Sequence, residues 1–218
     1  MAEELEGRRP IKTRDSGWAK AIARALSRTA VTPNAISVLS VVCAAAAGAC
    51  FFLSEGSAGA ARVALLVGAA VAVQARLICN LLDGMVAIEG GKASKTGGIF
   101  NDLPDRFADL LILAPAGYGL LGWPWARELG WLAGTLAVLT AYVRMLAASL
   151  GLPQDFRGVM SKPKRMAVMT AAALLSIGEP LLHERGGVVY AALLVVAVGS
   201  AVTVVGRTVR MARLLESR

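Results

Sequence analysis

Two stretches decide how this sequence is interpreted: residues 80–87, NLLDGMVA, and residues 101–109, NDLPDRFAD. Each places ionisable side chains in a long apolar segment. One such group inside a membrane helix costs about 2.5–3.5 kcal/mol on insertion scales, so several together indicate a polar cavity with a function. A membrane setting fits the composition, because 56% of the 218 residues are hydrophobic, 17% are charged and the mean hydropathy is +0.60.

Apolar segments long enough to cross a bilayer follow one another along the chain. A hydrocarbon core of about 30 Å requires roughly 20 residues of helix, and breaks rich in Gly, Pro and polar residues separate the segments. We expect an all-α integral membrane fold with six transmembrane helices, at residues 34–54, 59–88, 98–122, 129–150, 164–182 and 187–209. They would form one membrane domain over residues 31–218, after a cytoplasmic N-terminal segment at residues 1–30.

Basic residues are strongly biased to one side of these segments. Seventeen Lys and Arg residues fall on the side of the N-terminus and three on the other, and cytoplasmic loops retain positive charge. Both termini and the polar stretches are therefore predicted on the cytoplasmic face of the inner membrane. With 6% aromatic residues and no basic tract that carries stacking rings, nucleic acid is not an expected partner.

Residues 18–28 have the pattern of a helix that lies on the membrane surface. Lys20, Arg24 and Arg28 recur every four residues, while Trp18 lies elsewhere around the turn. An amphipathic helix of this kind binds the anionic inner leaflet, although a merely solvated charged face would show the same pattern. We expect an interfacial amphipathic helix before the first span.

The polar residues of the two stretches are spaced to share helix faces. At about 100° per residue, Asn80 and Asp83 lie on one face of the second helix, and Asp102, Asp105 and Asp109 lie on one face of the third. Carboxylates that crowd together raise one another's pKa unless a cation compensates them. Oxygen ligands without His or Cys favour Mg²⁺, Mn²⁺ or Ca²⁺ over zinc. A metal centre for phosphoryl transfer is the leading hypothesis; a packing network or a transport path for cations or protons is the alternative.

The same residues resemble the signature of the CDP-alcohol phosphotransferase family of integral membrane enzymes. That signature runs D-x-x-D-G-x-x-A-R and then, after eight to twelve residues, G-x-x-x-D-x-x-x-D. Asp83, Gly84 and Ala87 match its first half, and Asp105 and Asp109 match its second half. The likeness extends from about residue 30 to the end of the chain.

Three positions depart from the family signature. Asn80 stands in place of the first aspartate, Ile88 in place of the arginine and Asn101 in place of the second glycine. Asn80 can coordinate through its carbonyl oxygen but brings no negative charge. Asp102, one helical turn before Asp105, is the candidate to restore that charge. Arg106, Lys92 and Lys95 are the candidates to replace the arginine.

The resemblance implies a transferase that moves a phosphatidyl, or similar substituted phosphoryl, group from a CDP-linked lipid such as CDP-diacylglycerol to an alcohol, with release of CMP. It also implies Mg²⁺ or Mn²⁺ as the cofactor and a homodimer as the assembly. The expected residues are the metal ligands Asp83, Asp105, Asn80 and Asp102, the catalytic base Asp109, and the donor-binding residues Gly84, Ala87 and Arg106.

A second group of basic residues lies on the same predicted side of the membrane: Arg144, Arg157, Lys162, Lys164 and Arg165. Fixed cations bind phosphate oxygens strongly in a partly dry cavity, so we expect a phosphorylated polyol, glycerol phosphate or an inositol phosphate, as the acceptor. The loop residues would also be explained by topology alone, whereas Arg144 lies inside an apolar helix and needs a partner. The rival functions are a catalytically impaired relative that serves as a membrane binding or scaffold protein, and a small ion-coupled transporter.

Overall fold

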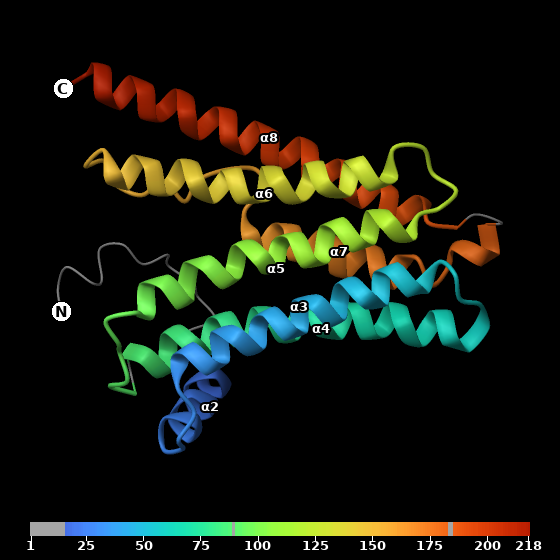
Figure 1. Cartoon of the computed structure of the whole chain (residues 1–218), viewed down its shortest axis with the longest axis horizontal. Coiled ribbons are helices and arrows are strands. Elements are labelled where there is room, and N and C mark those ends of the chain that lie inside the picture. The colour runs from blue at the N-terminus through green and yellow to red at the C-terminus, as the bar shows by residue number, and fades with distance from the viewer. Residues whose placement is uncertain (1–15, 89, 183–184) are drawn as a thin grey trace.

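The computed structural model describes residues 16–88, 90–182 and 185–218, and within these ranges all regular structure is helical. Residues 1–15, which belong to the predicted N-terminal segment, lie outside the described residues. The helices are α2 (Gly17–Ser27), α3 (Pro33–Ser54), α4 (Gly59–Ile88), α5 (Gly97–Gly119), α6 (Ala126–Ser149), α7 (Lys162–Leu175), the 3₁₀ helix η2 (Glu179–Leu182) and α8 (Gly187–Glu216) (Figure 1).

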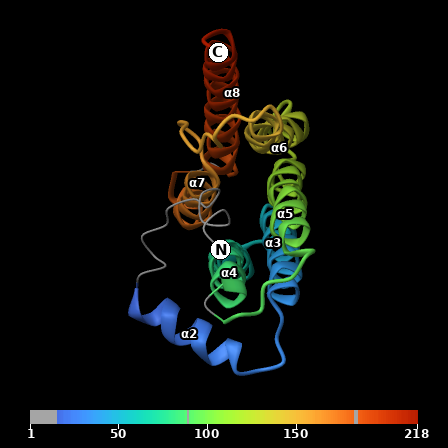
Figure 2. The same ribbon diagram turned by 90° about the vertical axis from the view of Figure 1, so that its left-hand side faces the viewer.

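The six longer helices after α2 pack in a closed ring. Following their contacts, α3 packs on α4, α4 on α7, α7 on α8, α8 on α6, α6 on α5, and α5 again on α3 (Figure 2). We call the end where α4 finishes and α5 begins the site end, and the end where α3 finishes and α4 begins the far end. The first span starts as its sequence predicts, because Thr32 accepts a hydrogen bond from the Ala35 amide and Pro33 occupies the first turn.

Small residues allow the helices to approach one another closely. A Cβ atom at Gly48 of α3 would overlap the Leu111 carbonyl oxygen of α5, and one at Gly130 of α6 would lie 2.8 Å from the Leu113 carbonyl oxygen. Buried alanines from all six helices fill much of the shared core. Where water does not drive helices together, such close backbone packing supplies the contact energy.

Four of the six predicted spans are long and apolar enough to cross a membrane, namely α3, α4, α6 and α8. The prediction of six uninterrupted spans is therefore confirmed only in part. Helix α5 carries four charged residues among its 23, and α7 has 14 residues, which extend about 21 Å at 1.5 Å per residue. The predicted span at 164–182 is in fact α7 followed by the separate helix η2.

Helix α2 lies before the first span, in the region where an interfacial amphipathic helix is predicted. Its Ala19 and Ala23 are buried, and it packs on α4. Trp18 is 46% exposed. One apolar strip of α2 thus contacts the bundle, while its basic side chains point away from the core.

A buried ion cluster closes the far end. Nη2 of Arg62 lies 3.1 Å from Oε1 of Glu55 and 2.7 Å from Oε2 of Glu179. The Glu179 carboxylate also accepts the amide of Gly186 at 3.0 Å and that of Val188 at 2.7 Å. A negative charge beside the first amides of a helix is favourable, so this cluster ties α3, α4, η2 and the start of α8 together.

Arg62→Met should destabilise the protein by about 3–5 kcal/mol, because removal of one partner leaves buried carboxylates without their counter-charge. Thermal or denaturant unfolding of the detergent-solubilised protein measures this loss. The matched control is Arg127→Met, which removes an exposed arginine at the same end, with a ring contact to Tyr118, and should cost less than about 1 kcal/mol. Equal losses in the two variants would contradict the role of the cluster.

Candidate active site

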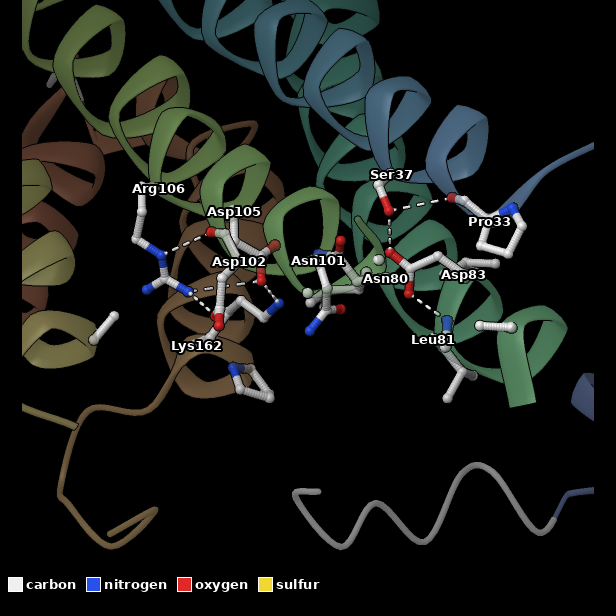
Figure 3. A pocket seen from close by; sticks show the side chains of 18 of the residues that line it. Pro33, Ser37, Asn80, Leu81, Asp83, Asn101, Asp102, Asp105, Arg106 and Lys162 are labelled. Atoms are coloured by element: carbon white, nitrogen blue, oxygen red, sulfur yellow. Dashed lines mark hydrogen bonds and ion pairs between the residues drawn. The ribbon is translucent and has the colours of Figure 1, made fainter. Parts of the chain in front are cut away.

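A cavity of about 890 Å³ lies at the site end of the ring. Residues from α3, α4, α5, α6, α7 and α8 line it, and Trp18 of α2 lies at its border. Its volume is within the range of ligand-binding cavities. One wall carries the acidic and amide side chains of α4 and α5, and Figure 3 shows them together with Lys162.

Asn80 and Asp83 project from one face of α4 into this cavity, as predicted. The Asp83 carboxylate is 4% exposed, and it accepts a hydrogen bond of 2.7 Å from the Ser37 hydroxyl of α3 and one of 2.5 Å from the Gly84 amide. Asn80 lies between Asp83 and the carboxylates of α5 (Figure 3). Its Nδ2 atom is buried and has no hydrogen-bond partner among the residues that the structure describes.

Asp102 and Asp105 line the cavity from α5, and basic groups hold both of them. Asp105 forms an ion pair with Lys162 of α7 and lies 3.8 Å from Nη2 of Arg106. Asp102 binds Nη2 of Arg144 at 2.9 Å and that of Arg106 at 3.4 Å. These pairs join α5 to α6 and α7 at the edge of the cavity.

Asp109 occupies a different position from the other carboxylates of α5. It is 0% exposed and is not among the residues that line the cavity. Its Oδ1 lies 2.9 Å from Nη2 of Arg76 and its Oδ2 lies 2.7 Å from Nη2 of Arg165. Asp109 would therefore reach a substrate hydroxyl only after a guanidinium partner released it.

The oxygen donors of α4 and α5 suit a hard divalent ion. Among the described residues, Oδ1 of Asp105 is buried and accepts no hydrogen bond, and Nη2 of Arg76 lies 3.6 Å from it. Carboxylate oxygens are the ligands that Mg²⁺ and Mn²⁺ prefer. In the part of the chain that the structure describes, however, no three acidic, His or Cys side chains are grouped as a metal cluster. Asp83 and Asp105 share the cavity but turn to separate partners, Ser37 and Lys162 (Figure 3).

The opposite wall of the cavity is basic. Arg144, Arg165 and Arg207 line it from α6, α7 and α8. Arg165 donates to the Thr140 hydroxyl at 3.3 Å, and Arg207 donates to the Thr140 carbonyl oxygen. Arg144 lies over the ring of Phe156, with 5.2 Å between its guanidinium carbon and the ring centroid. Three guanidinium groups thus converge on one region of the cavity wall.

Two of the predicted acceptor-binding residues lie outside this cavity. The Arg157 side chain is 74% exposed and pairs with Asp155, and Lys164 is exposed at the start of α7. Neither lines the cavity of the carboxylates. Residues three apart in a helix lie on nearly the same face, and residues two apart lie on opposite faces. Lys162 and Arg165 therefore face inward, while Lys164 does not.

The predicted donor-binding residues Gly84, Ala87 and Arg106 all line the cavity. Ile88, which takes the place of the signature arginine, lines it as well. Of the basic groups considered as replacements, Arg106 and Lys92 are at the cavity wall. Lys92 donates hydrogen bonds to the carbonyl oxygens of Thr29 and Val31, and Arg106 donates to Asp102.

Three residues at the site are not among those predicted from the sequence, namely Ser37, Arg76 and Arg207. The two arginines carry the signal that identified Arg144, a guanidinium group within an apolar segment. Ser37 carries no comparable signal, because serine is frequent wherever membrane helices pack closely.

The sequence of the chain matches that of a known protein family. Residues 30–205 match the sequence model of the CDP-alcohol phosphatidyltransferase family, which is most of the chain. The chain belongs to the CDP-alcohol phosphatidyltransferase family. It is thus a membrane enzyme of this family, whose members use divalent metals such as Mg²⁺ and Mn²⁺.

Similar proteins with assigned names are phosphatidylinositol phosphate synthases. The enzyme of Mycobacteroides abscessus is 26% identical over 196 residues, which cover 85% of this chain and 80% of the relative. That of Streptomyces avermitilis is 28% identical over 198 residues, which cover 86% and 75%.

Solved structures of the Mycobacterium tuberculosis phosphatidylinositol phosphate synthase share the fold. The form with CDP-DAG bound has a TM-score of 0.70 at 19% identity, and the match covers 90% of this chain and 94% of that one. The form in complex with manganese and citrate has a TM-score of 0.70 at 21% identity, with 88% of each chain covered.

Next to the basic wall, the loop between α6 and α7 is held by Asp155. Its carboxylate accepts the Arg157 amide at 2.8 Å and Nε of Arg210 at 2.7 Å. Burial opposes ionisation of Asp155, but these hydrogen bonds, with a further one from the Arg157 side chain, outweigh it and lower the pKa of the carboxyl from its ordinary value. Asp155 therefore stays ionised and keeps this loop on α8.

Acidification should release this loop only at low pH. Because the pKa of Asp155 in the folded protein lies below the unfolded value of about 3.9, its contribution is complete above that value and is lost as the pH falls through the folded pKa. Hydrogen exchange of the Arg157 amide, corrected for the intrinsic rate, should be equally protected at pH 7 and pH 5 and lose protection below about pH 4. Asp155→Asn should remove this dependence, and loss of protection already at pH 5 in the unaltered protein would contradict it.

Proposed function

We propose that this enzyme transfers a phosphatidyl group from a CDP-linked lipid such as CDP-diacylglycerol to a phosphorylated polyol, with release of CMP, in phospholipid biosynthesis. One observation carries the proposal: a single cavity has carboxylates of α4 and α5 on one wall and Arg144, Arg165 and Arg207 on the other. The first wall suits a metal-bound diphosphate and the second suits an anionic acceptor. The names of the relatives, phosphatidylinositol phosphate synthases, support an inositol phosphate as the acceptor.

In the proposed reaction, an acceptor hydroxyl oxygen forms a bond to the phosphatidyl phosphorus. The bond from that phosphorus to the bridging oxygen breaks, CMP leaves with the bonding electron pair, and the hydroxyl proton passes to a carboxylate. A divalent ion, when bound, offsets the negative charge of the diphosphate and of the departing CMP. Asp83 and Asp105, with Asn80 and Asp102 beside them, would hold that ion through their oxygen atoms.

Two carboxylates of α5 are candidates for the proton acceptor. Asp109 matches the general base of the family signature, but two guanidinium groups hold it outside the cavity. Asp102 lines the cavity, its side chain is 36% exposed, and it binds Arg144 of the basic wall. The pH profile of kcat of Asp102→Asn separates them, since loss of the true base removes its acidic limb.

The basic wall is proposed to bind the acceptor phosphate. Arg144, Arg165 and Arg207 come from three different helices, so a phosphate among them would meet guanidinium groups from three directions. Within the described part of the chain, Nε of Arg144 is buried and lacks a hydrogen-bond partner, which leaves a donor for an anionic ligand. Glycerol phosphate and inositol phosphate carry the required charge.

We further propose that helices α3 to α8 all lie in the membrane as one domain over residues 31–218, with the site end and both termini at the cytoplasmic face. Seventeen Lys and Arg residues at that side against three at the other support this orientation. Helix α2 would then lie on the inner leaflet, where its basic face meets anionic lipid. The homodimer implied by the family resemblance belongs to the same proposal.

Asp83→Asn, Asp105→Asn and Asp109→Asn should each reduce turnover to background, because each loses a charge that the ion, the diphosphate or Arg165 requires. The measurement is CMP release from CDP-diacylglycerol in detergent, with Mg²⁺ or Mn²⁺ and a panel of polyol phosphates. Glu128→Gln, an exposed change on α6 at the far end, is the control and should retain full activity. A variant that keeps turnover takes its residue out of the mechanism.

Arg144→Ala should raise the acceptor KM at least tenfold and change the donor KM less than twofold, because one charge-assisted hydrogen bond contributes about 1.5–3 kcal/mol. Steady-state kinetics with each substrate varied in turn measure both constants. Arg157→Ala provides the matched control, since its exposed side chain lies outside the cavity, and should alter neither constant. Equal increases in both constants for Arg144→Ala would indicate a structural role instead.

A further inference from the structure

A second, smaller cavity of about 390 Å³ lies between α6 and α8 at the site end. The two helices pack side by side (Figure 2), and residues 152–157 of the loop after α6 line the space between their C-terminal ends. Arg144 and Arg207 line both cavities, whereas Asp83 and Asp105 line the larger one alone. The two arginines therefore form the partition between the cavities.

Positive charge exceeds negative charge around the smaller cavity. Four arginines and one aspartate line it, namely Arg144, Arg157, Arg207, Arg210 and Asp155. Asp155 pairs with Nε of Arg157 at 3.0 Å and with Nε of Arg210 at 2.7 Å. Arg144 pairs with Asp102, which lines the larger cavity. Four guanidinium groups against two carboxylates leave two positive charges in excess.

Arg207 and Arg210 both have bonding capacity that the protein leaves unused. Arg207 is 7% exposed, and in the described ranges it forms no ion pair but donates to the carbonyl oxygens of Arg157 and Thr140. Nη2 of Arg210 is buried and has no hydrogen-bond partner among the described residues. Because a buried cation requires a nearby counter-charge, this side of the partition is suited to an anion.

Most of the remaining lining of the smaller cavity is apolar. Leu152 and Phe156 of the loop contribute to it, as do Met211 and Leu214 on the turn of α8 that follows Arg210. The volume exceeds what one phosphate group fills, and ligand cavities combine apolar walls with a few placed polar groups. The ligand that suits this cavity therefore has an anionic group and an apolar portion.

We infer that the smaller cavity binds a phosphate ester, with the phosphate between Arg207 and Arg210 and the apolar portion against Met211 and Leu214. Guanidinium groups donate paired, charge-assisted hydrogen bonds to phosphate oxygens. An anionic phospholipid and a soluble phosphate ester share this chemistry. The site lies beside the proposed acceptor position and goes beyond the proposed function, in which Arg210 takes no part.

The test is calorimetric titration of the purified full-length protein in maltoside detergent with two probes in turn, inorganic phosphate and micellar phosphatidylglycerol. Arg210→Gln should weaken the binding of at least one probe tenfold or more, because a charge-assisted hydrogen bond is lost. Weakening of phosphatidylglycerol alone identifies a membrane lipid as the ligand, and weakening of inorganic phosphate identifies the phosphate group itself as sufficient. Arg213→Gln, which removes an exposed arginine of α8 that lines neither cavity, is the matched control and should change neither affinity by more than twofold. Unchanged affinity for both probes in Arg210→Gln would overturn the inference.

Met211→Glu keeps the test decisive if loss of the pair between Arg210 and Asp155 disturbs the loop. This variant leaves the pair intact and adds a carboxylate to the same wall, so it should weaken the same probe at least tenfold. Both variants should keep the acceptor KM of CMP release within twofold. A tenfold rise of that KM in both would place the phosphate in the larger cavity and overturn the second site. Absence of CMP release in the unaltered protein would refute the proposed function and leave the binding result standing.

Discussion

Charge compensation inside an apolar ring of helices is the constraint on which this structure depends. A carboxylate or guanidinium group taken out of water must meet an opposite charge or a set of hydrogen bonds. Asp109 shows this most clearly, because it is fully buried and joins Arg76 of α4 to Arg165 of α7. The pairing holds three helices at the spacing that leaves a cavity beside them, so the ion pairs shape the site as well as stabilise it.

Charge compensation also divides the polar side chains of the site into two kinds, those that line the cavity and those that are buried in ion pairs behind it. Asp83 and Asp105 line the cavity, whereas both oxygens of the buried Asp109 are held by arginines. The basic wall follows the same division. Arg165 binds the buried Asp109 and also lines the cavity, while Arg144 lines the cavity and pairs with the partly exposed Asp102. The ion pairs that stabilise the fold thereby position the side chains that line the cavity.

The sequence was sufficient for the helical class, the family and the acidic wall, because a charge inside an apolar segment is conspicuous. Asn80, Asp83, Asp102 and Asp105 all line one cavity, as their helical spacing predicts. Helical spacing places a side chain on a face but not at a depth, which explains why Asp109 lies behind the wall. The 14-residue α7 was not predicted, since the apolar stretch continues beyond Leu175 through residues that form a turn and η2. Arg157 and Lys164 face outward. A basic residue next to a membrane helix orients that helix whichever way its side chain points, so the sequence does not indicate which of these residues reach the cavity.

The position of the cavity distinguishes a surface enzyme from a transport path. A path for ions across the membrane requires polar groups at mid-depth and access from both faces. In this ring the carboxylates and arginines of the cavity gather at the site end, and the core beyond them is formed by closely packed residues such as Phe51, Val73 and Leu193. The far end is closed by the ion cluster of Arg62, Glu55 and Glu179. The cavity thus lies at one end of the ring, as the proposed function requires of a site that both substrates reach from the same side of the membrane.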